Sequence, residues 1–166
     1  MCISSTHAYE FVNRFPDFGR YGLRMAEQGR PDLAAMLGGL MRRLMNAETP
    51  VLAEHGLTMW GYVVLSALDD GPVRTQAALA KAIGADKTRI IGTLDTLQED
   101  GLITREPDPK DRRVRLLGIT EAGRASRRSA QARIQEQEER LLGHLSAADR
   151  KAFLKAARVL SEAQWP

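Results

Sequence analysis

Two short helical segments joined by a glycine-containing turn constrain the fold more than any other part of the chain. Thr75 is placed to cap one helix, which Gly84 ends, and Asp86 is placed to cap the next, which Gly101 ends. A side-chain oxygen before the first turn and a glycine after the last are the usual signals of helix ends. Two short helices separated only by Gly84-Ala85 predict a helix-turn-helix.

A β-hairpin pattern follows directly. Residues 102–105 are predicted to form a strand that Pro107 ends, and residues 114–119 a returning strand, with a turn over residues 108–111. A hairpin in this position is the wing of a winged helix-turn-helix. Residues 58–120 are therefore predicted to form one winged helix-turn-helix region.

An amphipathic helix precedes this region. After Asp32, a candidate N-cap, apolar residues from Leu33 to Met45 recur at three- and four-residue steps. Thr58 is placed to cap a further helix, which the turn at residues 69–72 ends. The apolar stripe on the first of these helices is larger than a small winged helix could cover, which favours a second copy of the chain as its partner.

Two helices follow the hairpin. Thr120 is predicted to begin a long polar helix that runs to about Leu145, and residues 146–149 resemble a capping box that opens a last helix. The predicted fold class is mainly α with a small β-hairpin wing, that is, a winged helix-turn-helix plus a helical dimerisation lobe. Residues 32–57 and 121–166 are assigned to that lobe.

Composition places the chain among ordinary globular proteins. Hydrophobic residues make up 43% and charged residues 27% of 166, and no apolar run approaches the roughly 20 residues that span a bilayer. The single cysteine, Cys2, cannot form an internal disulfide, and the first residues lack the features of a secretory signal. We therefore expect a cytoplasmic protein without membrane contact. Residues 1–31 are rich in aromatics, which disordered tails are not, so this N-terminal extension is expected to pack on the dimerisation lobe.

The second helix of the helix-turn-helix carries the first set of candidate DNA contacts. Its apolar positions, Ile90, Leu94 and Leu97, are expected to face the core and so fix which side faces outward. Arg89 suits a bidentate contact with a guanine edge, because the first turn of this helix enters the major groove. The candidate DNA-binding residues on this helix are Lys87, Thr88, Arg89 and Thr93. The alternative is that they form an ordinary solvated surface.

The wing tip carries the second set of candidate DNA contacts. It is rich in cations, with Lys110, Arg112 and Arg113 in one short stretch. An arginine held at a loop tip suits a narrow minor groove, where the potential is strongly negative. Asp111 could orient Arg113. The alternative is again a solvated charged loop.

Several of these segments together resemble the MarR family of bacterial regulators. The more specific ones are the Asp-x-Arg of the wing and the Thr-Glu-Ala-Gly that leads from the hairpin into the next helix. The matching segments are Leu79-Ala80, Leu94-Asp95-Thr96-Leu97, Gly101-Leu102-Ile103, the run from Asp108 to Arg113, and Ile119-Thr120-Glu121-Ala122-Gly123.

The resemblance implies a homodimer whose N- and C-terminal helices interleave, with Arg113 in the minor groove of a pseudo-palindromic operator in double-stranded DNA. It also implies a repressor that a small aromatic or phenolic ligand releases from DNA. In the family, the start of the helix after Thr58 borders the effector pocket, so His55, Trp60 and Tyr62 are candidate ligand-binding residues. Each of these could equally be a core residue.

Two other functions remain open at this point: a winged-helix protein-interaction module without DNA binding, and a DNA binder with no small-molecule effector. An enzyme is not expected, because the sequence has no nucleophile motif, phosphate-binding glycine loop or paired catalytic carboxylates. Neither a metal site nor a cofactor is expected, since His7, His55 and His144 are far apart in the sequence.

Overall fold

The computed structural model describes residues 32–73, 75–109 and 111–164. Within these ranges helices dominate and a single hairpin provides the strands. The elements are, in chain order, α3 (Leu33–Glu54), α4 (Met59–Asp69), α5 (Gln76–Ala82), α6 (Lys87–Glu99), β1 (Ile103–Asp108), β2 (Asp111–Ile119), α7 (Glu121–Leu142) and α8 (Ala147–Glu162). The expectation for residues 1–31 lies outside the described residues.

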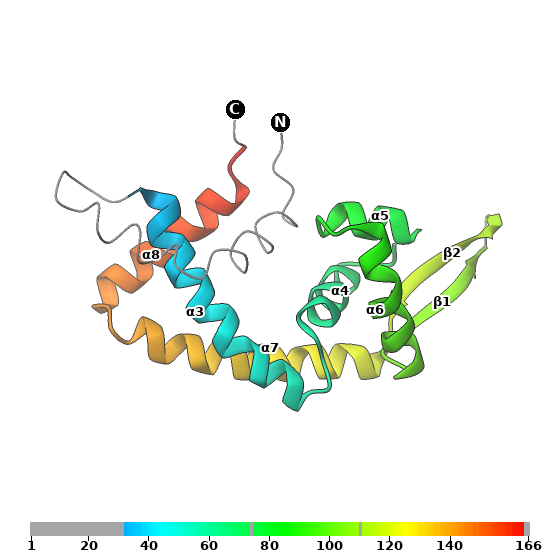
Figure 1. Ribbon diagram of the computed structural model, residues 1–166, viewed down its shortest axis with the longest axis horizontal. Coiled ribbons are helices and arrows are strands. Elements are labelled where there is room, and N and C mark those ends of the chain that lie inside the picture. Colours follow the sequence, from blue (N-terminus) through cyan, green and yellow to red (C-terminus); the bar gives the residue numbers. More distant parts are fainter. Residues whose placement is uncertain (1–31, 74, 110, 165–166) are drawn as a thin grey trace.

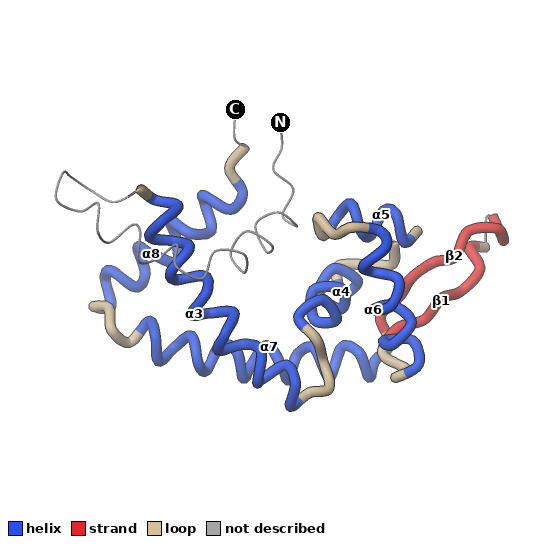
Figure 2. The backbone as a smooth tube through the Cα atoms, in the orientation of Figure 1, coloured by secondary structure: helices blue, strands red, loops and turns tan. Residues whose placement is uncertain are grey.

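The long helix α7 runs between two ends of the molecule, with α4–α6 and the hairpin at one end and α3 and α8 at the other (Figure 1). The tube drawing separates the all-helical end from the end that carries the hairpin (Figure 2). The predicted fold class, mainly α with a two-stranded wing, is confirmed. In the described part of the chain no single helix is long and apolar enough to cross a membrane; α3 and α4 meet that test only as a pair bent by 83°.

The predicted helix starts are confirmed by their capping hydrogen bonds. The hydroxyls of Thr58 and Thr75 each accept from a backbone N–H three residues later, at 3.0 Å in both cases. Asp86 accepts from Thr88 N at 2.7 Å, and Ser146 accepts from Asp149 N at 3.2 Å. Asp32 is the N-cap of α3, but its side chain makes no capping hydrogen bond.

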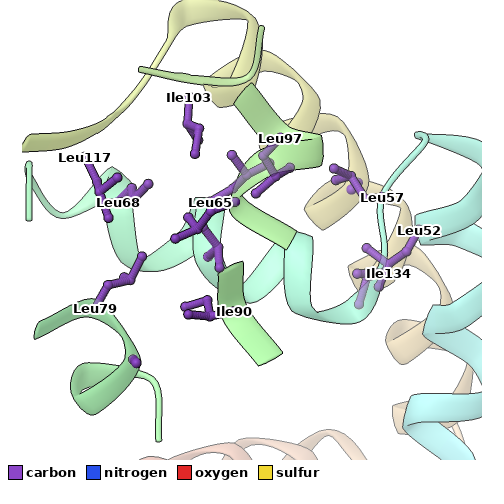
Figure 3. Packing of buried hydrophobic residues seen from close by; sticks show 14 of the residues in the cluster. Leu52, Leu57, Leu65, Leu68, Leu79, Ile90, Leu97, Ile103, Leu117 and Ile134 are labelled. Carbon is purple, nitrogen blue, oxygen red and sulfur yellow. The ribbon is translucent and has the colours of Figure 1, made fainter. Parts of the chain in front are cut away.

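The hydrophobic core fills the winged-helix end and continues to the junction of α3 with α7. Leu65 on α4 lies at its centre, surrounded by side chains from α5, α6 and the hairpin (Figure 3). Leu52 and Ile134 lie together where α3 meets α7. The stripe predicted to face inward from α6 is buried: Ile90, Leu94 and Leu97 are 2%, 0% and 3% exposed.

The two strands are longer than predicted. β1 continues through Pro107 to Asp108, and β2 begins at Asp111 instead of 114. Pro107 does not end the strand because the sheet has only two strands, so β1 has a free edge. On the other side of the hairpin, Val73 exchanges backbone hydrogen bonds of 2.9 and 2.8 Å with Leu117 of β2. An edge strand tolerates a proline, which cannot donate to a ladder, and the register shifts between Pro107 and Asp108.

One helix end also differs from the prediction. The helix begun by Thr120 ends at Leu142, not near Leu145, because Gly143 caps it. Leu145 N donates to the carbonyl of Leu142 in the short link to α8. The apolar residue at 145 therefore belongs to the connection and not to the helix.

Candidate nucleic-acid interface and effector site

The first turn of α6 carries the predicted base-reading positions. Lys87, Thr88 and Arg89 follow the N-cap Asp86 directly. Thr88 is exposed and Thr93 is partly buried at the edge of the helix. The side chains of Lys87 and Arg89 lie outside the description, so their DNA contacts stay predictions. The buried stripe opposite is consistent with an outward-facing first turn.

The wing positions are placed through their backbone alone. Arg112 and Arg113 lie near the start of β2, while Lys110 falls outside the described residues. Asp108 is 4% exposed and Asp111 is exposed, and both have interaction partners. The proposed role of Asp111 in orienting Arg113 remains a prediction.

An ion pair that sequence reasoning missed joins the wing to α6, the candidate recognition helix. The Arg105 guanidinium donates to Asp95 Oδ1 of α6 at 2.6 Å, and its side chain is only 20% exposed. Arg105 therefore positions the wing and is not a free cation at its tip. The sequence signal was the ten-residue spacing between an aspartate on α6 and a strand arginine, which is informative only once the hairpin is known to fold back on that helix.

A close backbone contact joins the hairpin to α7. The hydroxyl of Thr120 donates to the carbonyl of Gly101 at 2.8 Å and also accepts from Gly123 N at 3.0 Å. A Cβ at Gly123 would stand 2.1 Å from the carbonyl oxygen of Leu102, so no larger residue fits there. The Thr-Glu-Ala-Gly segment is thus a packing device that fixes where α7 leaves the winged helix.

A second ion-pair cluster holds α4 against α7. Asp69, at the end of α4, pairs with Arg124 and, at 3.1 Å, with Arg127. All three side chains are at least partly buried. This cluster anchors the winged helix to the helix that leads into the other end of the molecule.

The predicted ligand-binding residues lie around the junction of α3, α4 and α7. His55 caps α3, and its imidazole bonds to the carbonyl of Val51 through Nδ1 at 2.8 Å and to the hydroxyl of Ser129 on α7 through Nε2 at 2.9 Å. Trp60 and Tyr62 are partly buried on the first turns of α4. The structure therefore gives His55 a bridging role between helices, while ligand contact by the three residues stays a prediction.

Tyr62 lies within electrostatic range of two glutamates that sequence reasoning missed. Burial raises the pKa of its hydroxyl; Arg127 and a hydrogen bond to Ser66 lower it, and Glu48 and Glu138 raise it further. Burial also raises the pKa of Glu48, helped by Glu138 across the helix pair. The pKa of Glu138 is raised by burial and by its neighbour on α7. Glu48 and Glu138 lie on helices far apart in the sequence, so their proximity could be found only from the structure.

A cavity of about 120 Å³ lies between α3 and α7 beside these groups. Apolar side chains form much of its wall, and both glutamates line it. The lining residues are Arg43, Leu44, Ala47, Glu48, Ile134, Gln137, Glu138 and Leu141. In the described ranges no group of three or more His, Cys, Asp or Glu side chains could hold a metal ion.

Comparison with known proteins identifies a family. The model of the MarR family matches residues 55–114. The transcriptional repressor NicR of Pseudomonas putida is 30% identical over 131 residues, which cover 76% of this chain and 83% of NicR. The transcriptional regulator HosA of Escherichia coli O111:H- is 31% identical over 107 residues, which cover 64% of this chain and 79% of HosA.

Solved structures of similar fold support the same family. CouR from Rhodococcus jostii RHA1, bound to p-coumaroyl-CoA, has a TM-score of 0.65 at 26% identity, covering 81% of this chain and 95% of CouR. The repressor CouR bound to a 23-mer DNA duplex has a TM-score of 0.67 at 29% identity, covering 79% and 93%. With the winged-helix geometry and relatives matched over most of their length, the chain belongs to the MarR family of DNA-binding winged helix-turn-helix transcriptional regulators, which are not enzymes.

Proposed function

We propose that the chain is a homodimeric transcriptional repressor that binds a pseudo-palindromic operator and leaves it when a small aromatic or phenolic ligand binds. The observation that carries the proposal is the capped first turn of α6 beside the wing. The buried stripe on the opposite side of α6 leaves this turn free to enter a major groove. NicR and CouR, both named as repressors, support the direction of regulation.

The DNA-binding residues proposed are Lys87, Thr88, Arg89 and Thr93 on α6 and Lys110, Arg112 and Arg113 on the wing. The first turn of α6 would contact base edges in the major groove. The wing would lie along the DNA backbone and place its cations in the minor groove. The Arg105–Asp95 pair supports this arrangement because it couples the direction of the wing to that of α6. CouR bound to a DNA duplex supports the same use of the fold.

A homodimer is proposed on the exposure of apolar side chains at the helical end of the molecule. Leu37 and Met41 on α3 are 44% and 49% exposed, and Leu154 and Leu160 on α8 are 46% and 54% exposed. None of the residues of α8 is buried. Exposed apolar faces on two helices are the expected surface of an obligate helical interface.

The effector site is proposed at the junction of α3, α4 and α7, with contacts from His55, Trp60 and Tyr62. A ligand there would touch α4, which belongs to the winged helix, and also α3 and α7, which continue into the other end of the molecule. It could shift the spacing of the two recognition helices only through different affinities for the DNA-bound and free arrangements. CouR bound to p-coumaroyl-CoA supports an aromatic ligand class.

Selection of bound sites from random duplex DNA tests the proposal. We expect a pseudo-palindrome whose half-sites are centred about one helical turn, ~34 Å, apart. The affinity for the selected duplex should fall steeply with salt, because each phosphate contact releases counterions. Recovery of no preferred sequence, with no binding even in dilute buffer, would contradict it and favour a protein-interaction module instead.

A further inference from the structure

We propose that Ile91 on α6 is a specificity-determining residue that packs against the C5-methyl group of a thymine in the major groove of each operator half-site. This inference rests on the proposed function, since it adds an apolar contact to the polar contacts proposed for the same helix. The DNA contacts predicted from the sequence all involve charged or hydroxyl-bearing side chains, so none of them accounts for Ile91.

The first support is where Ile91 lies among the exposed apolar side chains of the described residues. Its side chain is 39% exposed. The other large apolar side chains that these residues expose lie on α3, on α8 or in the link before α8, at the end of the molecule proposed to form the dimer. Ile91 lies at the opposite end, on α6, which carries the proposed base contacts (Figure 1). The proposed dimer interface therefore does not account for its exposure.

The second support is the side of α6 on which Ile91 lies. Residues three and four positions apart share one side of a helix, so Thr88, Ile91, Gly92 and Asp95 lie together, and all four are exposed. Ile90, the adjacent residue in the sequence, belongs to the buried stripe and is 2% exposed. One known class of major-groove helix contacts the duplex through positions i, i+3, i+4 and i+7, which is the spacing of these four residues. Ile91 therefore lies in the middle of the surface that the proposed function places in the groove.

The third support is that the neighbours of Ile91 leave room for a duplex. Gly92 has no side chain, and there is open space within 4 Å of where its Cβ would stand. A free carboxylate at Asp95 would repel phosphates, but Asp95 accepts a hydrogen bond of 2.6 Å from the Arg105 guanidinium, which offsets its charge. This side of α6 thus combines an exposed apolar side chain with bare backbone and a paired acid.

The chemistry of the base edges selects thymine as the partner. In the major groove thymine presents a C5-methyl group, which the other three unmodified bases lack. Isoleucine has no side-chain donor or acceptor, so packing it on a polar base edge would leave that edge without a hydrogen bond. Burial of one methyl group corresponds to roughly a fourfold gain in affinity. Ile91 is therefore expected to favour thymine at one position of each half-site.

Replacement of thymine by deoxyuridine in the selected operator tests the inference, because it removes the methyl group and keeps every hydrogen-bonding atom. Each pair of thymines related by the operator symmetry is replaced in turn, and the affinity of the full chain is measured by fluorescence anisotropy. We expect replacement at the contacted position to weaken binding roughly fourfold for each half-site, on the order of tenfold in total. Operator binding that no replacement weakens would overturn the inference and leave the proposed function intact.

Ile91→Ala identifies the side chain that contacts the methyl group. This variant should bind the thymine operator about as weakly as the parent binds the deoxyuridine operator, with no further loss on deoxyuridine. Ile91→Val keeps a branched apolar side chain and should keep most of the response. Leu145→Ala is the control, because it truncates a similarly exposed apolar side chain, 41% exposed, outside the winged helix, and it should respond as the parent does. Thermal unfolding shows that each variant is folded. A parent-like response of Ile91→Ala would assign the methyl contact to another residue and overturn the inference.

Failure of the proposed function has a different signature. A selection that yields no preferred duplex, with no binding even in dilute buffer, would refute the proposed function and with it any groove contact by Ile91. Sequence-specific binding without dependence on a thymine methyl group would refute the role of Ile91 alone. Methyl-dependent binding that Ile91→Ala abolishes supports both.

Discussion

Two arginines are expected to have different roles in DNA binding: Arg113 contributes mainly to affinity, and Arg89 also to sequence preference. Arg113→Ala on the wing should weaken operator binding by roughly 1–3 kcal/mol, and Arg89→Ala by a similar amount while relaxing base preference. Arg133→Ala, an exposed α7 arginine paired with Glu136, is the control. Anisotropy titrations against the operator and single-base variants measure both effects. Equal weakening of all duplexes by Arg89→Ala would make Arg89 a phosphate contact.

Two glycines in helices should respond in opposite ways to alanine. A Cβ at Gly123 would collide with the backbone of Leu102, so Gly123→Ala should destabilise the fold by roughly 1–3 kcal/mol in spite of the better helix propensity of alanine. Gly92 on α6 has open space around it, so Gly92→Ala should stabilise the fold by about 1 kcal/mol. Urea denaturation measures both.

Gly92 carries a further consequence for DNA binding. It is exposed on the recognition helix, where a glycine lets a backbone approach another molecule closely. If Gly92→Ala stabilises the protein but weakens operator binding, the glycine is kept for close approach to DNA. Unchanged operator binding would show that the position is neutral in recognition.

Among single residues, the sequence predicted the features that depend only on neighbouring positions in the chain. The caps Thr58, Thr75 and Asp86 depend on contacts two or three residues away, so they were predictable. The partner of Arg105 and the crowding at Gly123 depend on how the hairpin folds against its neighbours, which no local pattern encodes.

Among the contacts between elements, the ion pairs of Asp69 at the end of α4 are expected to contribute strongly to the stability of the fold. Asp69→Asn would leave the partly buried Arg124 and Arg127 without their shared anion, and should destabilise the fold by roughly 1–3 kcal/mol. Glu136→Gln, which removes an exposed pair, should change stability by less than about 0.5 kcal/mol. Urea unfolding compares them, and equal effects would contradict the anchoring role.

The glutamate pair between α3 and α7 should make stability depend on pH. The folded state raises the pKa of Glu48 and of Glu138, mainly by burial, above the ordinary value of 4.5. The folded protein therefore binds more protons than the unfolded chain, and stability falls as the pH rises from about 4.5 through the raised values. Above the raised pKa values the whole penalty applies.

Glu48→Gln/Glu138→Gln should accordingly raise the midpoint of thermal unfolding at pH 7, with the gain disappearing below the ordinary pKa. The arginines nearby stay charged throughout this range, so they do not alter the sign. A double variant that is less stable than the parent at pH 7 would mean that the two carboxylates make favourable interactions in the folded protein, which would contradict this expectation.

The length of the strands shows why element boundaries were harder to predict than element types. Pro107 signals a strand end on its own, and it does so correctly in a central strand. Here the sheet has only two strands, so β1 has a free edge, where the proline is tolerated. The number of strands in the sheet, which no local pattern encodes, therefore decided the outcome.

For the molecule as a whole, the sequence predicted the order of elements and the fold class, because helix periodicity and the wing pattern survive without tertiary information. The cavity between α3 and α7 was not predictable, since its two glutamates lie on helices separated by the entire winged helix. The same long separation lets one helix, α7, connect DNA reading at one end to the exposed apolar faces at the other (Figure 1).

Those faces give the last prediction, which concerns assembly. Leu154→Glu/Leu160→Glu places charges on the exposed apolar side of α8 and should convert a dimer into a monomer, because buried unpaired charges disfavour a helical interface. Lys155→Gln, on the same helix, should leave the dimer unchanged. Sedimentation velocity measures the mass. Since one copy then engages only one half-site, operator affinity should fall by roughly 10²- to 10⁴-fold while single half-site binding persists. A double variant that sediments as a dimer would place the interface elsewhere, and a parent protein that sediments as a monomer would contradict the two-fold arrangement on which operator recognition depends.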